Sequence, residues 1–133
     1  MNGDSTGKQA VNGPIIVAVD DDFRVRESIE SLFESAGHKT ALFASADEFL
    51  RSGMLAKAAC VITDVRMPGV DGIELQRRIR KENPVLPVIF ISAHVSPESR
   101  QLALSEGAVE FLYKPFDAAE LLRIVQAALN KSR

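Results

Sequence analysis

The stretch Ala58-Ala59-Cys60-Val61-Ile62-Thr63-Asp64 is a short apolar run that ends in a carboxylate, and Val65-Arg66-Met67-Pro68-Gly69 follows it directly. An aspartate between an apolar run and a Pro-Gly turn is usually a turn residue, because its side chain can bond the backbone two residues further on. Asp64 could instead be a reactive group presented at the end of a buried strand. The rest of the chain decides between these two interpretations.

The composition of the chain is that of a globular domain. Of its 133 residues, 46% are hydrophobic and 26% are charged, and this length supports one domain with its own core. We expect residues 14–131 to form that domain and the polar residues 1–13 to form a disordered tail. The net charge of −2 gives no electrostatic basis for binding nucleic acid or an anionic membrane.

The cysteine content and the apolar segments bear on localisation. Cys60 is the only cysteine, so no disulfide can form within the chain and a reducing compartment fits. Residues 1–12 lack the apolar segment of a secretory signal. The longest apolar stretches, near Ile15–Val19 and Val88–Ile91, are too short to span a bilayer. We therefore expect a cytoplasmic protein without a membrane partner.

Strand-like and helix-like segments alternate along the chain. Apolar, β-branched runs predict five strands, at residues 15–19, 38–43, 58–63, 87–92 and 108–113. Residues that can cap a helix precede the segments between and after them, at Asp20–Asp22, Ser45, Asp71, Ser96 and Asp117. The second of the five predicted helices is expected to carry Met54 on its apolar face. Parallel strands need crossover helices, so this alternation predicts an open parallel sheet with helices on both faces.

Polar side chains follow four of these strands. They are Asp20–Asp22, Asp64, Ser92 and Lys114. Sites in such sheets lie outside the carboxyl ends of the strands, so these residues are expected to meet in one crevice. Each also has a simpler explanation on its own: an aspartate could cap a helix, Ser92 could be a strand-end hydroxyl, and Lys114 could be a solvated cation.

The chemistry of the combined set favours phosphoryl transfer. Two carboxylates ~4 Å apart repel by ~4 kcal/mol at an effective dielectric constant of ~20, so a cation must offset them. Lys114 can neutralise one charge, and Mg²⁺ is the usual partner of carboxylate and phosphate oxygens. A carboxylate such as Asp64 can attack a phosphoryl group to form an aspartyl phosphate. The hydroxyl of Ser92 would then help to neutralise the phosphoryl oxygens.

Between about Ile15 and Leu129 the sequence resembles the receiver domains of bacterial two-component response regulators. The motifs occur in the family's order: Val19-Asp20-Asp21-Asp22, then Thr63-Asp64-Val65-Arg66-Met67-Pro68-Gly69, then Phe90-Ile91-Ser92-Ala93, and finally Lys114-Pro115-Phe116. The resemblance implies an α/β, flavodoxin-like (βα)5 doubly wound sheet of five parallel strands in the order 2-1-3-4-5. It also implies a cis peptide bond between Lys114 and Pro115.

The resemblance assigns a role to each matching position. These roles are the phosphoacceptor for Asp64, the metal-binding pair for Asp20 and Asp21, a further Mg²⁺ ligand for the backbone carbonyl of Arg66, the switch hydroxyl for Ser92, the switch aromatic for Phe111, and the phosphate-sensing cation for Lys114. The match is incomplete at two positions. Ser92 stands where threonine is commoner, and Phe111 lacks the hydroxyl of a tyrosine, so it would act through packing. Arg66 and His94 resemble positions that tune hydrolysis of the aspartyl phosphate.

The function implied is a phosphorylation switch, and not an enzyme with a separate substrate, since it catalyses only its own phosphorylation and dephosphorylation. A sensor histidine kinase donates a phosphoryl group to Asp64, Ser92 moves toward it, and Phe111 repacks inward. This would change the surface formed by the fourth and fifth helices and the fifth strand, and so alter homodimer formation or partner docking. No direct binding of nucleic acid by this domain is expected.

Three other functions stay open. Asp20-Asp21-Asp22 after an apolar strand resembles the Asp-x-Asp of haloacid-dehalogenase phosphohydrolases, with Asp20 as nucleophile and Asp22 as the acid-base group. Arg24, however, stands where that family uses threonine or valine. A flavin-binding flavodoxin-like protein would share the architecture, although an acidic first loop would repel a phosphate. The chain could also be a receiver that acts as an adaptor without being phosphorylated.

Overall fold

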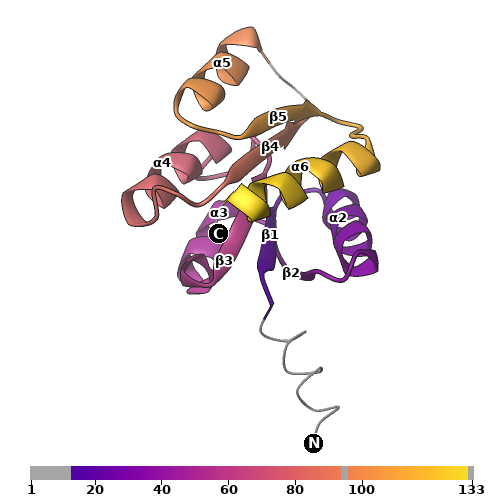
Figure 1. The fold of residues 1–133 in the computed structure, drawn as a ribbon. Helices are drawn as coiled ribbons and strands as arrows, with labels where there is room; N and C mark the ends of the chain where they lie inside the picture. Colours follow the sequence, from indigo (N-terminus) through magenta and orange to yellow (C-terminus); the bar gives the residue numbers. More distant parts are fainter. Residues whose placement is uncertain (1–12, 94–95, 132–133) are drawn as a thin grey trace, which may run out of the picture.

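The computed structural model describes residues 13–93 and 96–131, which form a five-stranded parallel sheet with helices on both faces (Figure 1). The strands are β1 (Ile15–Val19), β2 (Lys39–Phe43), β3 (Ala58–Thr63), β4 (Val88–Ser92) and β5 (Glu110–Tyr113). Their order is β2-β1-β3-β4-β5, which confirms the predicted topology. Three strands begin one or two residues later than predicted. The predicted disordered tail falls almost entirely on residues 1–12, outside the described residues.

The five predicted helices are present, together with a short 3-10 turn. They are α2 (Phe23–Ser35), α3 (Ala46–Arg51), α4 (Gly72–Glu82), α5 (Pro97–Ser105) and α6 (Ala118–Lys131), and the 3-10 turn is η1 (Met54–Ala56). The prediction that Met54 belongs to the second helix is wrong. Helix α3 ends at Arg51, because Gly53 takes a left-handed conformation (φ +78°) and starts η1. Met54 still packs against the core, from the turn.

Side-chain caps begin the helices at the predicted residues. Asp22, Ser45, Asp71 and Ser96 each accept a hydrogen bond from a backbone N–H in the first turn of their helix. Asp117 accepts one from the backbone N–H of Glu120 at 3.0 Å, just before α6. These bonds satisfy donors that have no partner inside a helix, so each helix starts at a fixed point relative to the strand before it.

The sheet separates two apolar cores. Ile16 and Ala18 of β1 face α2 and α6, where they pack with Ile29, Phe33 and other buried side chains. Val17 and Val19 of the same strand face the opposite core, with α3, α4 and α5. The inner strands are therefore covered on both faces, which is why their sequences are continuously apolar instead of alternating. Within the described residues, no helix is long and apolar enough to cross a membrane.

One buried polar side chain lies between α4 and α5. Gln76 is fully buried, and its Nε2 donates to the backbone carbonyl of Ala103 at 3.3 Å. Its Oε1 is buried without a hydrogen-bond partner among the described residues. An unsatisfied buried acceptor costs about 1–3 kcal/mol, whereas the bond that Gln76 makes contributes roughly 1 kcal/mol. The amide therefore adds little to stability.

We predict that Gln76→Met leaves the free energy of unfolding unchanged or raises it by about 1 kcal/mol. The substitution keeps the volume and removes the orphaned oxygen, and the carbonyl of Ala103 still accepts the backbone N–H of Ala108 at 3.0 Å. Chemical denaturation measures the change. Gln76→Glu serves as the contrasting variant, since it buries an ionisable group at the same place and is expected to destabilise the protein. A loss above about 1 kcal/mol in Gln76→Met would contradict this account.

Candidate functional site

The carboxyl ends of four strands bring the predicted site residues together. Asp20 follows β1, Asp64 follows β3, Ser92 ends β4 and Lys114 follows β5. Backbone hydrogen bonds fix these ends to one another. The N–H of Asp64 donates to the carbonyl of Val19 at 3.1 Å, and the N–H of Lys114 donates to the carbonyl of Ser92 at 2.9 Å. The Lys114–Pro115 peptide bond is cis, as predicted.

The ammonium group of Lys114 bridges two carboxylates. Its Nζ lies 3.0 Å from Oδ2 of Asp20 and 2.9 Å from Oδ2 of Asp64. Asp20 is 2% exposed and Asp64 is 6% exposed, so water screens these charges only weakly. Burial by itself would lower the pKa of Lys114, but its hydrogen bonds to Asp64 and Asp20 outweigh burial and raise it. Lys114 therefore stays charged at neutral pH.

The buried carboxyl group of Asp20 carries an electrostatic cost. Burial raises the pKa of Asp20 above its ordinary value of 3.8, although the backbone N–H of Asp22 and the ammonium of Lys114 act in the opposite direction. The N–H of Asp22 donates to Oδ1 of Asp20 at 2.9 Å. Because the pKa is raised on folding, the ionised form of Asp20 destabilises the folded protein relative to the protonated form.

Asp64 is held through both of its oxygens. Oδ2 accepts from Lys114, and Oδ1 accepts from the backbone N–H of Arg66 at 3.3 Å. The turn that the sequence predicted after Asp64 is therefore present, and it orients the carboxylate. A second, independent contact comes from Lys114, fifty residues further along the chain. This second contact distinguishes Asp64 from a simple turn residue.

The acidic residues have the composition of a Mg²⁺ site. Asp20, Asp21 and Asp64 each offer a carboxylate oxygen, and the three oxygens lie within 4.8 Å of one another. Lys114 balances one of the three negative charges, and the two that remain match a divalent cation. Oxygen ligands and access to water through the exposed Asp21 suit Mg²⁺, which retains several water ligands in proteins. The backbone carbonyl of Arg66 as a further ligand stays a prediction.

Asp22 does not share this arrangement. Its Oδ1 caps α2 by accepting the backbone N–H of Arg24 at 2.9 Å. That hydrogen bond lowers the pKa of Asp22. A general acid at neutral pH needs a raised pKa, so the geometry disfavours the acid-base role that a phosphohydrolase would require of Asp22.

The aromatic side chain expected to take part in switching is already inside the protein. Phe111 is 3% exposed, and its ring stacks on that of Phe90 with 5.6 Å between centroids. The expected inward repacking of Phe111 therefore has no outward starting point here, because without a hydroxyl the ring has no polar group that favours the surface. Ser92 is 1% exposed at the end of β4. His94 lies outside the described residues.

Two residues that position the acidic groups were not predicted from the sequence. Nη1 of Arg26, on α2, donates to the backbone carbonyl of Asp20 at 2.7 Å. Gly72, the first residue of α4, lies so close to the backbone carbonyl of Asp64 that a Cβ at this position would collide with it. A glycine in the first turn of a helix is a detectable feature of the sequence, since glycine is a poor helix former. The contact of Arg26 with Asp20 has no comparable signal in the sequence.

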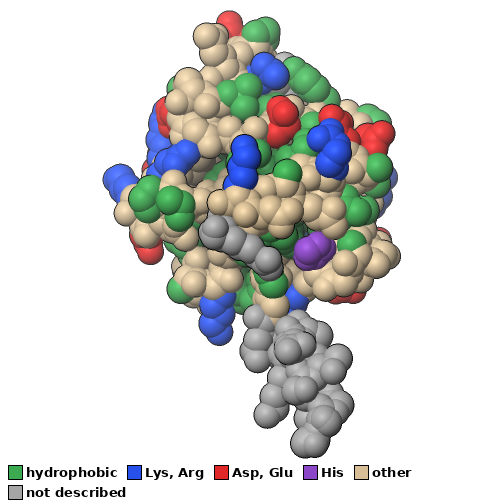
Figure 2. Space-filling model, viewed as in Figure 1, with side chains coloured by type: hydrophobic (Ala, Val, Ile, Leu, Met, Phe, Trp, Pro, Cys, Tyr) green, Lys and Arg blue, Asp and Glu red, His purple; other side chains and the backbone are tan. Residues whose placement is uncertain are grey.

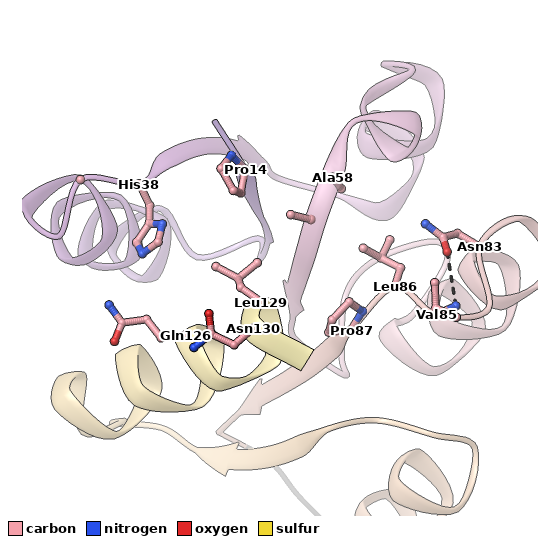
Figure 3. Close-up of a pocket in the computed structure, with 12 residues that line it drawn as sticks. Pro14, His38, Ala58, Asn83, Val85, Leu86, Pro87, Gln126, Leu129 and Asn130 are labelled. Carbon is pink, nitrogen blue, oxygen red and sulfur yellow. Dashed lines mark hydrogen bonds between the residues drawn. The ribbon is translucent and has the colours of Figure 1, made fainter. Parts of the chain in front are cut away.

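The largest of the described cavities lies elsewhere. It has a volume of about 740 Å³ and opens at the amino-terminal edge of the sheet, among His38, Leu86, Gln126 and Leu129 (Figure 3). The described residues that line it include no aspartate, glutamate, lysine or arginine. It therefore offers no charged group to a metal ion or phosphoryl group, and the candidate site is the smaller acidic cluster at the other edge.

The order of the strands and helices places the protein among the flavodoxin-like α/β proteins. A family model described as the response regulator receiver domain matches residues 16–126. The chain therefore belongs to the response regulator receiver family of two-component systems. Receiver domains are switch domains and not enzymes in the usual sense.

Similar proteins share this assignment. Nodulation protein W of Bradyrhizobium diazoefficiens is 38% identical over 125 residues, which are 94% of this chain and 55% of that protein. Response regulator protein TodT of Pseudomonas putida is 39% identical over 116 residues, which are 87% of this chain and 51% of that protein. The chain thus spans little more than half the length of these curated relatives.

Solved receiver structures resemble the whole domain. A response regulator receiver domain protein from Clostridium thermocellum has a TM-score of 0.84 and 31% identity, over 90% of this chain and 97% of that chain. Chemotaxis protein CheY4 of Vibrio cholerae has a TM-score of 0.78 and 28% identity, over 86% of this chain and 98% of that chain.

We predict that Asp20→Asn stabilises the metal-free protein at neutral pH. The cost of ionised Asp20 is absent below the unfolded pKa near 3.8 and grows as the pH rises through the raised folded pKa. The difference in Tm between Asp20→Asn and the unmodified protein should therefore increase with pH, to about 3–5 °C for each kcal/mol removed. Thermal denaturation in a chelator measures it. Asp117→Asn, which keeps its helix cap, is the control. A Tm difference that falls as the pH rises would contradict the predicted destabilisation by ionised Asp20.

We predict that millimolar Mg²⁺ raises the Tm of the unmodified protein. A ligand at about 100 times its Kd stabilises the folded state by roughly 2.7 kcal/mol, which corresponds to ~8–14 °C here. Asp21→Asn should lose most of this shift, because it removes one of the three carboxylates, while Asp117→Asn should retain it. An unchanged Tm in the folded, unmodified protein would argue against a metal site.

Proposed function

We propose that this domain is a phosphorylation switch in which Asp64 accepts a phosphoryl group from a sensor histidine kinase. The observation that carries the proposal is the position of Lys114 Nζ, 2.9 Å from Oδ2 of Asp64 and 3.0 Å from Oδ2 of Asp20. A buried carboxylate held by a charged donor, next to two further carboxylates, is suited to phosphoryl transfer and has no need of an acid-base group.

In the transfer step, a carboxylate oxygen of Asp64 attacks the phosphorus atom of a phosphohistidine. The new P–O bond forms as the P–N bond breaks, and the electron pair leaves on the imidazole nitrogen of the donor. Lys114 already contacts Asp64, so its charge is in place to neutralise a phosphoryl oxygen. Mg²⁺ held by Asp20, Asp21 and Asp64 would supply further positive charge for the incoming oxygens.

A groove beside the site supports docking of the donor. It has a volume of about 650 Å³ and lies between the start of α2 and the start of α6, with Val25 and Phe116 among its lining residues. Lys114 and Ala93 also line it, so the groove opens directly at the acceptor side of the sheet. An imidazole ring carried by a partner could enter there, with apolar side chains against its faces and the phosphoryl group directed at Asp64.

The response to phosphorylation begins at Ser92. Its hydroxyl is expected to turn toward the phosphoryl group and carry the end of β4 with it, while Phe111 stays packed on Phe90. The surface affected is formed by α5, β5 and α6, where Tyr113 is 54% exposed and forms a groove with Arg100 and Leu104. We expect this surface to control homodimer formation or the docking of an output partner.

The central test is label transfer to Asp64. Asp64→Asn should take up no phosphoryl group from a phosphorylated histidine kinase or from acetyl phosphate, whereas the unmodified protein should gain one. Intact-protein mass spectrometry measures the gain. Asp71→Asn is the matched control, because Asp71 caps α4 a few residues away and asparagine caps equally well.

Uptake of label by folded Asp64→Asn would contradict the proposal. The absence of uptake by the unmodified protein from either donor, in the presence of Mg²⁺, would favour the receiver that acts as an unphosphorylated adaptor.

A further inference from the structure

Helix α5 is exposed along its first half. It lies at the β5 edge of the sheet, at the outside of the molecule (Figure 1). Between Pro97 and Leu102 all residues are exposed except Ser99, which is half-buried. Within α5, all of which the structure describes, Ala103 is the only buried residue. The first half of this helix therefore contributes little to the core, and few apolar contacts hold it in place.

The apolar contacts of this region are concentrated at the end of α5. Ala103 and Ala108 are buried in the core that also contains Ile79 and Leu86, and Leu104 packs against it. Ala103, Leu104 and Ala108 lie in the last turn of α5 and the loop after it. The hydrophobic anchor of α5 is thus at its C-terminal end.

Polar side chains of α4 reinforce the same end. Nε and Nη2 of Arg77 donate to the two carboxylate oxygens of Glu106, each at 2.8 Å. Nε of Arg80 donates to the backbone carbonyl of Glu106 at 2.8 Å, and Nη1 donates to the carbonyl of Pro84 at 2.6 Å. Together with the bond from Gln76 to Ala103, these contacts form what we call the α4 clasp: Gln76, Arg77 and Arg80 on one helix, holding Ala103 and Glu106 on the other.

A glycine makes the clasp possible. Gly107 has φ +106°, a conformation that side chains rarely adopt. A Cβ at this position would also collide with the guanidinium of Arg80. The guanidinium of Arg80 can therefore pack directly on the backbone of the turn after α5, because Gly107 has no side chain.

The first half of α5 has no equivalent of the clasp. Ser96 caps the helix by accepting the N–H of Ser99 at 3.1 Å, which is a contact within the same segment. Among the residues that the structure describes, every hydrogen bond or ion pair that joins α5 and its C-cap residue to α4 reaches residues 103 and 106. In the chain this half follows β4, which ends at Ser92 at the carboxyl edge of the sheet.

We propose that the α4 clasp makes the C-terminal end of α5 a fixed pivot, so that only the first half of α5 can be displaced. The pivot is a property of the contacts themselves, while the trigger, a shift of Ser92, rests on the proposed phosphorylation of Asp64. A nine-residue helix is ~13 Å long, so a small rotation at its anchored end displaces the other end by several times as much as the residues near the pivot. The displaced surface contains Arg100 and Gln101.

Amide hydrogen exchange followed by NMR tests the pivot without phosphorylation. In the unmodified protein, the amides of residues 100–102 should exchange at least about tenfold faster than those of residues 104–106, although both sets lie within α5 or at its C-cap. Arg77→Ala combined with Arg80→Ala should reduce this ratio to below about threefold, because the end of α5 then keeps only its apolar contacts and the bond from Gln76.

The matched control is Arg78→Ala combined with Lys81→Ala. It removes the same charge from the same helix, but in the described part of the chain Arg78 pairs only with Glu74, within α4. The control should keep the tenfold ratio. Should the clasp variant not fold, Glu106→Gln weakens the bidentate pair with Arg77 and should narrow the ratio while Arg80 still holds the backbone.

Equal exchange rates in the two halves of the unmodified helix would overturn the pivot. An unchanged ratio in the folded clasp variant, or in Glu106→Gln, would overturn the role of the clasp.

A second arm of the experiment adds acetyl phosphate and Mg²⁺. The amide chemical shifts should then change more over residues 97–102 than over residues 103–107. If Asp64 takes up no phosphoryl group, the proposed function fails, while the exchange ratio still decides on the pivot.

Discussion

The arrangement of the acidic edge depends on one ammonium group placed between two buried carboxylates. Lys114 reaches from the end of β5 to Asp20 after β1 and Asp64 after β3. Without it, two nearly buried negative charges would face each other at the centre of the sheet edge. With it, the cluster is held together but still carries excess negative charge, and that excess makes the edge receptive to a cation. The same contact fixes the ends of three strands that are far apart in the sequence.

The sequence was sufficient to predict the alternating strands and helices and the convergence of Asp20, Asp64 and Lys114, because these follow from local patterns. The strand order itself was implied only by the resemblance to receiver domains. Continuous apolar runs predicted buried parallel strands, and capping residues such as Asp71 and Ser96 predicted where helices begin. The rule that sites lie at the carboxyl ends of strands then placed Asp20, Asp64 and Lys114 together. The sequence was less informative where a contact joins distant residues without leaving a pattern, as with Arg26 and the carbonyl of Asp20.

Two differences from the sequence predictions have the same physical origin. Met54 leaves the second helix because Gly53 adopts a left-handed conformation that the spacing of apolar residues does not reveal. Phe111 is buried because its packing on Phe90 is decided by tertiary contact and not by its neighbours in the chain.

Helix α4 shows how far such contacts extend. Its first residue touches the backbone of Asp64, and its last turns hold the end of α5, so one element borders both Asp64 and the helix that follows Ser92.

The ring of Tyr113 has a practical consequence. The chain contains one tyrosine and no tryptophan, so this single ring dominates its near-ultraviolet absorption and fluorescence. Its centroid lies 6.2 Å from that of Phe111, and the residue precedes Lys114 directly. The natural chromophore therefore lies at the exposed end of β5, next in the chain to the lysine whose ammonium group contacts Asp64. Tyrosine fluorescence of the unlabelled protein thus reports mainly on this one neighbourhood, with only a weak background from the seven phenylalanines.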